Sequence, residues 1–425
     1  MSPTFRALNS RNYRLWLSGA IVSNVGTWMQ RVAQDWLVLT VLTHHSTEAV
    51  GITTGLQFLP MLLLAPYGGL VADRMPKRRL LMFTQLAMGL LAAGLGLLVV
   101  TGLVQLWMVF GFALALGCVT ALDNPARQTF VSEMVPHEHL SNAVGLNSAT
   151  FNAGRIIGPG IAGLLIAWFG TGPVFLINGA SFGAVLISLS RMRVRELRIT
   201  PPTLRAKGQL RDGMRYVASR PDLVLIMAIV FAIGTFGLNF QMTTAFVATS
   251  VFHKGAGEYG LLGSIMAIGS LAGALLSARR EKPQLRYVVG AAFAFGVFAT
   301  VASQMPSYPL FAISLVPVGL SALTMMTSAN ASVQMSVDPA LRGRVMALYM
   351  AIFMGGTPIG SPIVGWVGGV LGARWSILVG GLVAIATSLV AAAWIIHSRQ
   401  LRVRLRFAPA PHVVLQPSAS TMMER

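Results

Sequence analysis

Long apolar blocks, separated by short polar joints, run along almost the whole chain. Examples are VLIMAIVFAIGTFG at 224–237 and ILVGGLVAIATSLVAAAWII at 377–396. With their flanking residues, several blocks are long enough to cross about 30 Å of hydrocarbon as helices. Breaks at charges, prolines and polar turns predict an all-α integral membrane protein with twelve transmembrane helices. The predicted spans are 15–42, 50–72, 80–103, 107–131, 141–169, 173–191, 223–246, 259–278, 287–305, 309–333, 345–370 and 375–397.

The longest polar interruption divides the chain into two similar halves. It is a basic stretch between the sixth and seventh spans. FNAGRIIGPGIAG at 151–163 aligns with FMGGTPIGSPIVG at 353–365, at an offset of 202 residues, which indicates an internal repeat. Two six-helix halves joined by a linker are typical of transporters that rock about a central site. We expect an N-terminal six-helix bundle, a basic cytoplasmic linker, a C-terminal six-helix bundle and a disordered cytoplasmic tail, at 1–190, 191–221, 222–400 and 401–425.

Composition and charge placement support this topology. Hydrophobic residues make up 54% of the chain and charged residues only 11%, about half the fraction usual in soluble domains. If the N-terminus is cytoplasmic, the inner segments hold 27 of the 32 Lys and Arg residues, and the outer loops hold only Lys254 and Arg374. The other three, Arg31, Arg127 and Arg155, lie inside spans. This asymmetry predicts a multi-pass protein of the cell inner membrane with both termini cytoplasmic.

Several classes of protein are disfavoured. The net charge of +19 follows from membrane topology, whereas a nucleic-acid-binding protein would need a soluble basic domain. The sequence contains no G-x-x-x-x-G-K phosphate loop and no H-E-x-x-H motif, and its one cysteine, Cys118, can form no internal disulfide. The polar residues within spans form neither a nucleophile and base set nor a metal cluster. We therefore expect no enzyme, no cofactor and no metal site.

Charged residues within spans one, four and five are the candidate coupling groups. Arg31 and Asp35 are four residues apart, as are Asp123 and Arg127, so each pair can share one helix face and interact. Arg31 or Asp35 would cost a few kcal/mol if it faced lipid, so we expect both residues to face a central cavity. Arg155 lies within span five.

Asp35 is the leading candidate for the proton-coupling site. A carboxyl group in a partly dry cavity favours its neutral form, a nearby arginine favours the charged form, and the balance can change when the cavity opens to the other side. Asp123 is the second candidate, and Arg31, Arg127 and Arg155 are the charge partners. Two alternatives stay open: a static Arg31–Asp35 pair that orders span one, and a structural lock between Asp123 and Arg127.

Two motifs resemble those of a known family. GLVADRMPKR at 69–78 resembles the loop signature of the major facilitator superfamily, G-x-x-x-D-R-x-G-R-K, with Pro76 in place of a glycine. GRIIGPGIAG at 154–163 resembles the antiporter signature of its drug-efflux members, with Ala162 in place of a glycine. NVGTWMQ, LQFLPMLLLAP and ALDNPARQ resemble the branch that includes the enterobactin exporter and many bacterial multidrug exporters. The resemblance covers about residues 5–400 and implies the major facilitator fold, with two pseudo-symmetric six-helix bundles.

The resemblance also implies roles for the residues of both motifs. Asp73, beside a basic cluster, can accept charge-assisted hydrogen bonds and latch one conformation, although the cluster also sets topology. The spaced glycines of span five allow close helix approach and its proline bends the helix, which serves either rocking or packing alone. The gating-loop residues are Gly69, Asp73, Arg74, Lys77 and Arg78, and the antiporter-motif residues are Gly154, Gly158, Pro159 and Gly163.

Signals for the substrate are weaker. Aromatic and methionine side chains suit a permissive pocket, although such a stripe more often reflects packing. The candidates for the cavity wall are Trp28, Phe151, Asn152, Phe236, Phe240 and Met350. We predict a monomeric secondary transporter in the lipid bilayer that exports small amphipathic compounds, by proton antiport with alternating access. The alternatives are a dedicated exporter of one metabolite, such as a siderophore, and a nontransporting membrane sensor.

Overall fold

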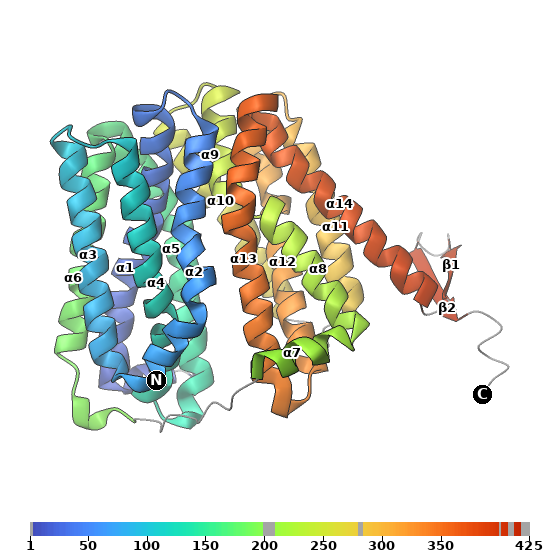
Figure 1. Cartoon of the computed structure of the whole chain (residues 1–425), viewed down its shortest axis with the longest axis horizontal. Helices are drawn as coiled ribbons and strands as arrows, with labels where there is room; N and C mark the ends of the chain where they lie inside the picture. The colour runs from blue at the N-terminus through green and yellow to red at the C-terminus, as the bar shows by residue number, and fades with distance from the viewer. Residues whose placement is uncertain (1–2, 199–208, 279–283, 399–400, 407–411, 418–425) are drawn as a thin grey trace.

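The computed structural model describes residues 3–198, 209–278, 284–398, 401–406 and 412–417. Its helices form two bundles that lie side by side, one from each half of the chain (Figure 1). One end of the assembly carries Lys77, Arg78 and Arg342 and is called the basic end below. The N-terminus and helix α7 lie at this end (Figure 1).

The N-terminal bundle contains the six predicted helices. α1 is preceded by a 3-10 helix at Pro3–Asn9 and continues as a π-helical segment at Leu37–Leu42. Ser46 caps α2, because its hydroxyl accepts a hydrogen bond from the backbone N–H of Ala49 at 3.2 Å. A short 3-10 turn at His137–His139 leads into the fifth helix. The helices are α1 Arg11–Trp36, α2 Thr47–Arg74, α3 Lys77–Val100, α4 Leu106–Met134, α5 Leu140–Phe169 and α6 Thr171–Ser190.

The C-terminal bundle has the same plan with one difference. The seventh predicted span, 223–246, is two helices, with a break that contains Gly237 and Asn239. Both residue types have low helix propensity, so the break was detectable as a weak signal within the apolar run. The helices are α8 Pro221–Phe236, α9 Phe240–Ser250, α10 Ala256–Ala278, α11 Leu285–Ser303, α12 Tyr308–Ser336, α13 Pro339–Leu371 and α14 Ala373–Ser398.

The linker and the tail contain structure that the sequence analysis did not expect. Within the linker, Val194–Glu196 is a 3-10 turn and Gln209–Ala218 forms helix α7 across the basic end (Figure 1), while residues 199–208 lie outside the described part. In the tail, strand β1 at Leu401–Arg406 pairs antiparallel with β2 at His412–Pro417. The expectation of a disordered tail is therefore corrected for these segments. The strict alternation of LRVRLR is a pattern typical of a strand.

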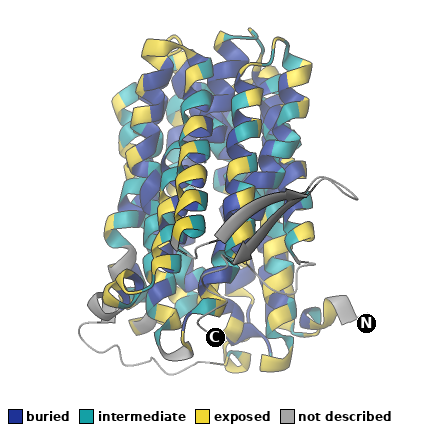
Figure 2. Ribbon diagram, turned by 90° about the vertical axis from the view of Figure 1, so that its right-hand side faces the viewer, coloured by how far each residue is buried: buried dark blue, intermediate teal, exposed yellow. Residues whose placement is uncertain are grey.

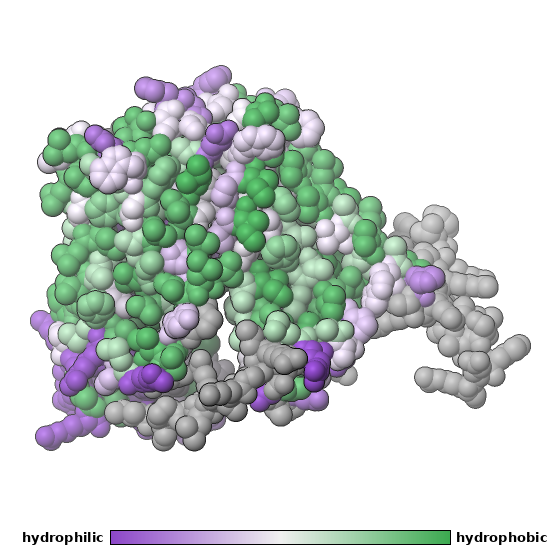
Figure 3. All heavy atoms as spheres, in the orientation of Figure 1, coloured by the Kyte–Doolittle hydropathy of each residue, from purple (hydrophilic) through white to green (hydrophobic). Residues whose placement is uncertain are grey.

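Eleven helical segments of the described chain are long and apolar enough to cross a membrane, with α8 and α9 counted as one. Helix α1 does not meet this criterion, since Arg31, Asp35 and neighbouring amides dilute its apolar character. It nevertheless packs between α5 and α6 inside the bundle, which completes the twelve-span architecture. Exposed residues lie on the outer surfaces of the bundles and buried ones between the helices (Figure 2). Hydrophobic atoms form a belt between two more hydrophilic ends (Figure 3).

Glycines at equivalent positions of the two halves confirm the internal repeat. Gly170 ends α5 with a φ of 77° and Gly372 ends α13 with a φ of 101°, a backbone region that favours glycine. These residues are 202 positions apart, the same offset that aligns the two motifs. The two halves therefore share a common helix-and-turn plan.

The halves meet at the end opposite the basic end through two equivalent helix pairs, α5 with α10 and α13 with α2. A Cβ at Gly163 would lie 2.6 Å from the carbonyl oxygen of Ala256, and one at Gly365 would lie 2.6 Å from that of Thr47. The hydroxyl of Thr47 donates to the carbonyl of Gly365 at 2.7 Å. Only glycine permits such close backbone approach.

Toward the basic end the halves separate. A Cβ at Gly145 of α5, or at Gly343 of α13, would meet no atom within 4 Å. Figure 3 shows a gap between the halves that opens toward this end. The structure is therefore closed at one end and open at the other.

Candidate functional site

A cavity of about 330 Å³ lies between the two halves. Helices α1, α2 and α5 form one wall. The other wall is formed by α8, α9, the break between them, α10, α12 and α13. This volume lies in the range of small-molecule sites. The position between the halves is the one at which a rocking transporter holds its substrate.

Asp35 lines this cavity and contacts the opposite half. Its side chain is buried, with the residue 6% exposed, and its Oδ2 atom lies 3.4 Å from the hydroxyl of Tyr259 in α10. The same hydroxyl lies 3.1 Å from the backbone carbonyl of Gln241 in α9. The ring of Tyr259 stacks on Trp36, with centroids 6.0 Å apart and planes inclined by 17°. Asp35 therefore sits where α1 touches the C-terminal bundle.

Arg31 lines the same cavity, and the described contacts include no ion pair between it and Asp35. Its guanidinium lies over the ring of Trp28 at 4.7 Å and near that of Phe58 at 5.6 Å. Side chains on a helix lean toward its N-terminus, which carries Arg31 toward Trp28, and aromatic faces attract cations. The two charges therefore share a cavity without an ion pair between them among the described contacts, so no contact supports the alternative of a static pair.

Arg155 enters the cavity from α5. Its Nε and Nη2 atoms are buried and have no hydrogen-bond partner within the described protein, and the same is true of Nε of Arg31 and Nε1 of Trp28. A guanidinium cannot lose its proton in a protein, so these donors stay charged or polar and available.

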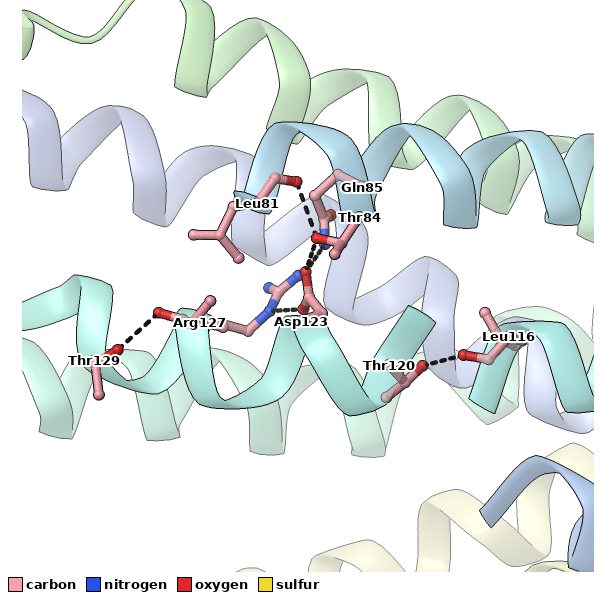
Figure 4. Close-up of polar contacts among 9 residues, drawn as sticks. Leu81, Thr84, Gln85, Leu116, Thr120, Asp123, Arg127 and Thr129 are labelled. Carbon is pink, nitrogen blue, oxygen red and sulfur yellow. Dashed lines mark hydrogen bonds and ion pairs between the residues drawn. The ribbon is translucent and has the colours of Figure 1, made fainter. Parts of the chain in front are cut away.

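Asp123 lies outside the cavity, between α3 and α4 (Figure 4). It is 2% exposed and accepts hydrogen bonds from Thr84 at 2.6 Å, Gln85 at 2.8 Å and Arg127 at 2.8 Å. The guanidinium of Arg127 also lies 5.3 Å from the ring of Trp16. Its contacts join α3 to α4 within one half. The geometry matches the alternative of a structural lock.

The residues predicted for the cavity wall divide into two groups. Trp28 and Phe240 line the cavity. Phe151 and Met350 do not, because each lies one helical turn nearer the basic end than a lining residue, and they are 49% and 41% exposed. Asn152 donates to the backbone of its own helix, and Phe236 packs in the core of the C-terminal half. The cavity is lined instead by the residues one helical turn after Phe151 and Met350, which are Arg155 and Met354.

The described gating-loop residues are tied to other helices of the N-terminal bundle. Nζ of Lys77 lies 2.5 Å from Glu133 at the end of α4, and Arg78 donates to the carbonyl of Leu189 in α6 at 2.7 Å. Gly69 and Arg74 belong to the last turns of α2. The backbone of residue 73 lies in α2, but its side chain is outside the described part, so the predicted latch by Asp73 stays a prediction.

The antiporter motif places α5 against both halves. Cβ atoms at Gly154 and Gly158 would crowd α1, at 3.0 Å from Asn24 and 2.7 Å from Trp28. Gly163 approaches α10, and Pro159, within α5, lines the cavity. The motif therefore sets how closely α5 packs on its own bundle and on the opposite one.

Further polar residues, not predicted from the sequence, complete the cavity. Tyr259 lies 224 residues from Asp35 and carries no signal that links the two. Gln34 and Gln57 line the cavity and bond to each other at 3.0 Å, while Asn239 and Gln241 flank the start of α9. The available signal was an amide within each otherwise apolar span.

Comparison with known proteins agrees with this architecture. Residues 2–417 match the family model for transmembrane secretion effectors. The staphyloferrin A transporter of Staphylococcus aureus is 24% identical over 404 residues, which cover 92% of this chain and 98% of that protein. The multidrug efflux pump Tap of Mycolicibacterium fortuitum is 27% identical over 363 residues, covering 82% of this chain and 87% of that protein.

Solved structures show the same fold. A bacterial homologue of the human lysosomal transporter Spinster, in an inward-facing and unoccupied conformation, matches with a TM-score of 0.72 and 15% identity, covering 94% of this chain and 99% of that one. Together with the family match and the two-bundle architecture, this likeness indicates that the chain is a transporter and not an enzyme. The chain belongs to the transmembrane secretion effector family, in the efflux branch of the major facilitator superfamily, and is a multi-pass membrane transporter of small molecules.

Proposed function

We propose that this transporter exports small amphipathic compounds in exchange for protons, by alternating access of the central cavity. The observation that carries the proposal is Asp35, a buried carboxyl group in the cavity that contacts the opposite bundle. The aromatic and methionine side chains around it suit varied apolar groups. The efflux function named for the Tap relative supports the direction of transport.

The contact between Asp35 and Tyr259 gives the proton a means to act on the conformation. The hydroxyl of Tyr259 has one hydrogen, which it can donate either to the carbonyl of Gln241 or to ionised Asp35. When Asp35 is neutral, its own hydroxyl donates to the oxygen of Tyr259, and Tyr259 donates to Gln241. Because this contact joins the two bundles, the protonation state of Asp35 changes the strength of the closed end.

The proposal includes an orientation in the cell inner membrane. The basic end faces the cytoplasm, by the positive-inside rule, so the gap between the halves opens inward and both termini are cytoplasmic. The gating-loop residues, with Asp73, control closure of this end. Bundles at 1–190 and 222–400 rock about the cavity as a monomer, with the 191–221 linker between them.

The test is Asp35→Asn, which keeps the size of the side chain but cannot titrate. In proteoliposomes with an imposed pH gradient, wild type should accumulate substrates from a panel of dyes and antibiotics against their gradients. The variant should lose this accumulation and retain exchange down a substrate gradient. Asp222→Asn, which removes an acid paired with Arg220 outside the cavity, is the matched control. Normal proton-driven accumulation in Asp35→Asn would remove Asp35 from coupling.

Dedicated export of one metabolite, such as a siderophore, is the second candidate. The observation in its favour is the staphyloferrin A transporter, which aligns over 98% of its length. The mechanism would be the same. A panel that adds siderophores to the dyes and antibiotics separates the two, since a dedicated exporter would move one class and leave the rest.

A further inference from the structure

The unpartnered polar atoms of the cavity are nearly all hydrogen-bond donors. Among the described residues that line it, five buried donor atoms have no protein partner, and one acceptor atom has none. The acceptor is Oδ1 of Asn239. The donors are Trp28 Nε1, Arg31 Nε, Arg155 Nε, Arg155 Nη2 and Gln241 Nε2.

This excess of donors is accompanied by an excess of positive charge. Arg31 and Arg155 are permanently charged, and Asp35 is the acid among the lining residues described. Buried donors without partners cost free energy, so a ligand that supplies acceptors to them is bound favourably. Guanidinium groups match carboxylate and phosphate oxygens in charge and geometry.

We propose that the substrate carries an anionic group, a carboxylate, sulfonate or phosphate, which Arg31 and Arg155 bind from neighbouring helices of the N-terminal bundle. Its apolar part lies against Trp28, Phe58 and Phe240. The substrate is thus an amphipathic organic anion. This inference rests on the proposed function, because it assumes that the transported compound occupies this cavity.

The charges also restrict how such a substrate can exchange with a proton. An anionic group alone would favour neutral Asp35, because an anion and a carboxylate in one cavity repel each other. Exchange requires competition with the proton, so the substrate must also present a hydrogen-bond donor or a cation to ionised Asp35. A compound with an anionic group at one end and a hydroxyl or ammonium group farther along meets both requirements.

Three naphthalene compounds that differ in one group test the anion site. They are 6-hydroxy-2-naphthoate, its carboxamide and the corresponding naphthylmethylammonium ion, titrated calorimetrically into the purified full-length protein. We expect the carboxylate to bind most tightly, then the amide, then the cation. Arg31→Gln or Arg155→Gln should weaken carboxylate binding about tenfold or more and weaken amide binding by a smaller factor.

Matched variants separate this site from a general charge effect. Lys254→Gln removes a positive charge outside the cavity and should change none of the affinities. Arg155→Lys keeps the charge and should recover part of the carboxylate affinity. Equal binding of the three compounds, tighter binding of the cation, or no binding of any at millimolar concentration would overturn the anion site.

Transport measurements distinguish this inference from the proposed function. If a pH gradient drives accumulation of neutral or cationic dyes at the same rate in wild type and Arg155→Gln, proton-driven export stands and the anion site fails. If the carboxylate binds through the two arginines but no pH gradient moves it, the site stands and proton antiport fails.

Discussion

Tyr259 is the residue through which the C-terminal bundle contacts the candidate coupling acid. Tyr259→Phe keeps the ring that stacks on Trp36 and removes the hydroxyl near Asp35. We expect a folded protein that moves fewer protons per substrate molecule. The proton-driven flux should fall by up to about tenfold, because that factor corresponds to the net free energy of one hydrogen bond. Simultaneous pH and substrate recordings in vesicles give this ratio.

Tyr308→Phe is the matched control, because its hydroxyl donates to the backbone of Glu258 at 2.8 Å, outside the cavity. It removes the same atom in the same region of the fold. An unchanged coupling ratio in Tyr259→Phe would show that the proton does not act through this contact.

Asp123 should behave differently from Asp35, because its contacts lie within one bundle. Asp123→Asn weakens the bond to Arg127 and removes one acceptor for Thr84 or Gln85, so the free energy of unfolding should fall by about 1–3 kcal/mol. Yield and thermal unfolding in detergent measure this loss. Transport by the folded variant should remain coupled to protons. A stable Asp123→Asn protein that transports without proton coupling would instead indicate that Asp123 carries the proton.

At the scale of helices, the closed end depends on glycines that let α5 approach α10. In Gly163→Val the new Cβ would lie 2.6 Å from the carbonyl oxygen of Ala256 and 3.1 Å from the Cα of Gly257. Backbone atoms of a packed helix cannot move aside without a cost in free energy. The variant should therefore open this end and shift the population away from the conformation described. Gly365→Val, its repeat equivalent, should do the same through Thr47.

The shift is measured as the labelling rate of a Thr54→Cys reporter in the cavity, in a Cys118→Ser background, with an impermeant thiol reagent applied from outside. We expect faster labelling in both glycine variants. Gly183→Val in α6, where a Cβ meets no atom within 4 Å, is the control. Equal labelling in all three would mean that these contacts do not hold the end closed.

At the scale of the whole molecule, the proposed orientation predicts the location of both termini. The N-terminus and the described end of α14 lie toward the basic end, as an even number of spans requires (Figure 1). Protease accessibility of an N-terminal and of a C-terminal tag should therefore match, with both protected in intact cells and both cleaved in inverted vesicles. A tag cleaved only in intact cells would reverse the orientation.

Much of this architecture was predictable because its causes are local or compositional. Apolar length, charge placement and the 202-residue repeat determined the spans and the two bundles, and each depends only on residue type along the chain. The resemblance of the two motifs indicated the family. The spacing of charges within spans identified Arg31, Asp35 and Arg155, all of which line the cavity. The sequence did not predict the break between α8 and α9. It also did not predict how deep each side chain lies along its helix, so Met350 lies one turn nearer the basic end than the cavity wall.

The tertiary structure alone decided which buried polar groups meet. A polar residue within a span must avoid lipid, but it satisfies that requirement equally well against a neighbouring helix or a central cavity. The choice depends on how each helix is rotated and packed, so Asp123 faces α3 while Asp35 faces Tyr259, 224 residues away. The direction of Arg31 depends likewise on the rings beside it. Residue type therefore determined that these charges are buried inside the protein, and helix packing determined their partners.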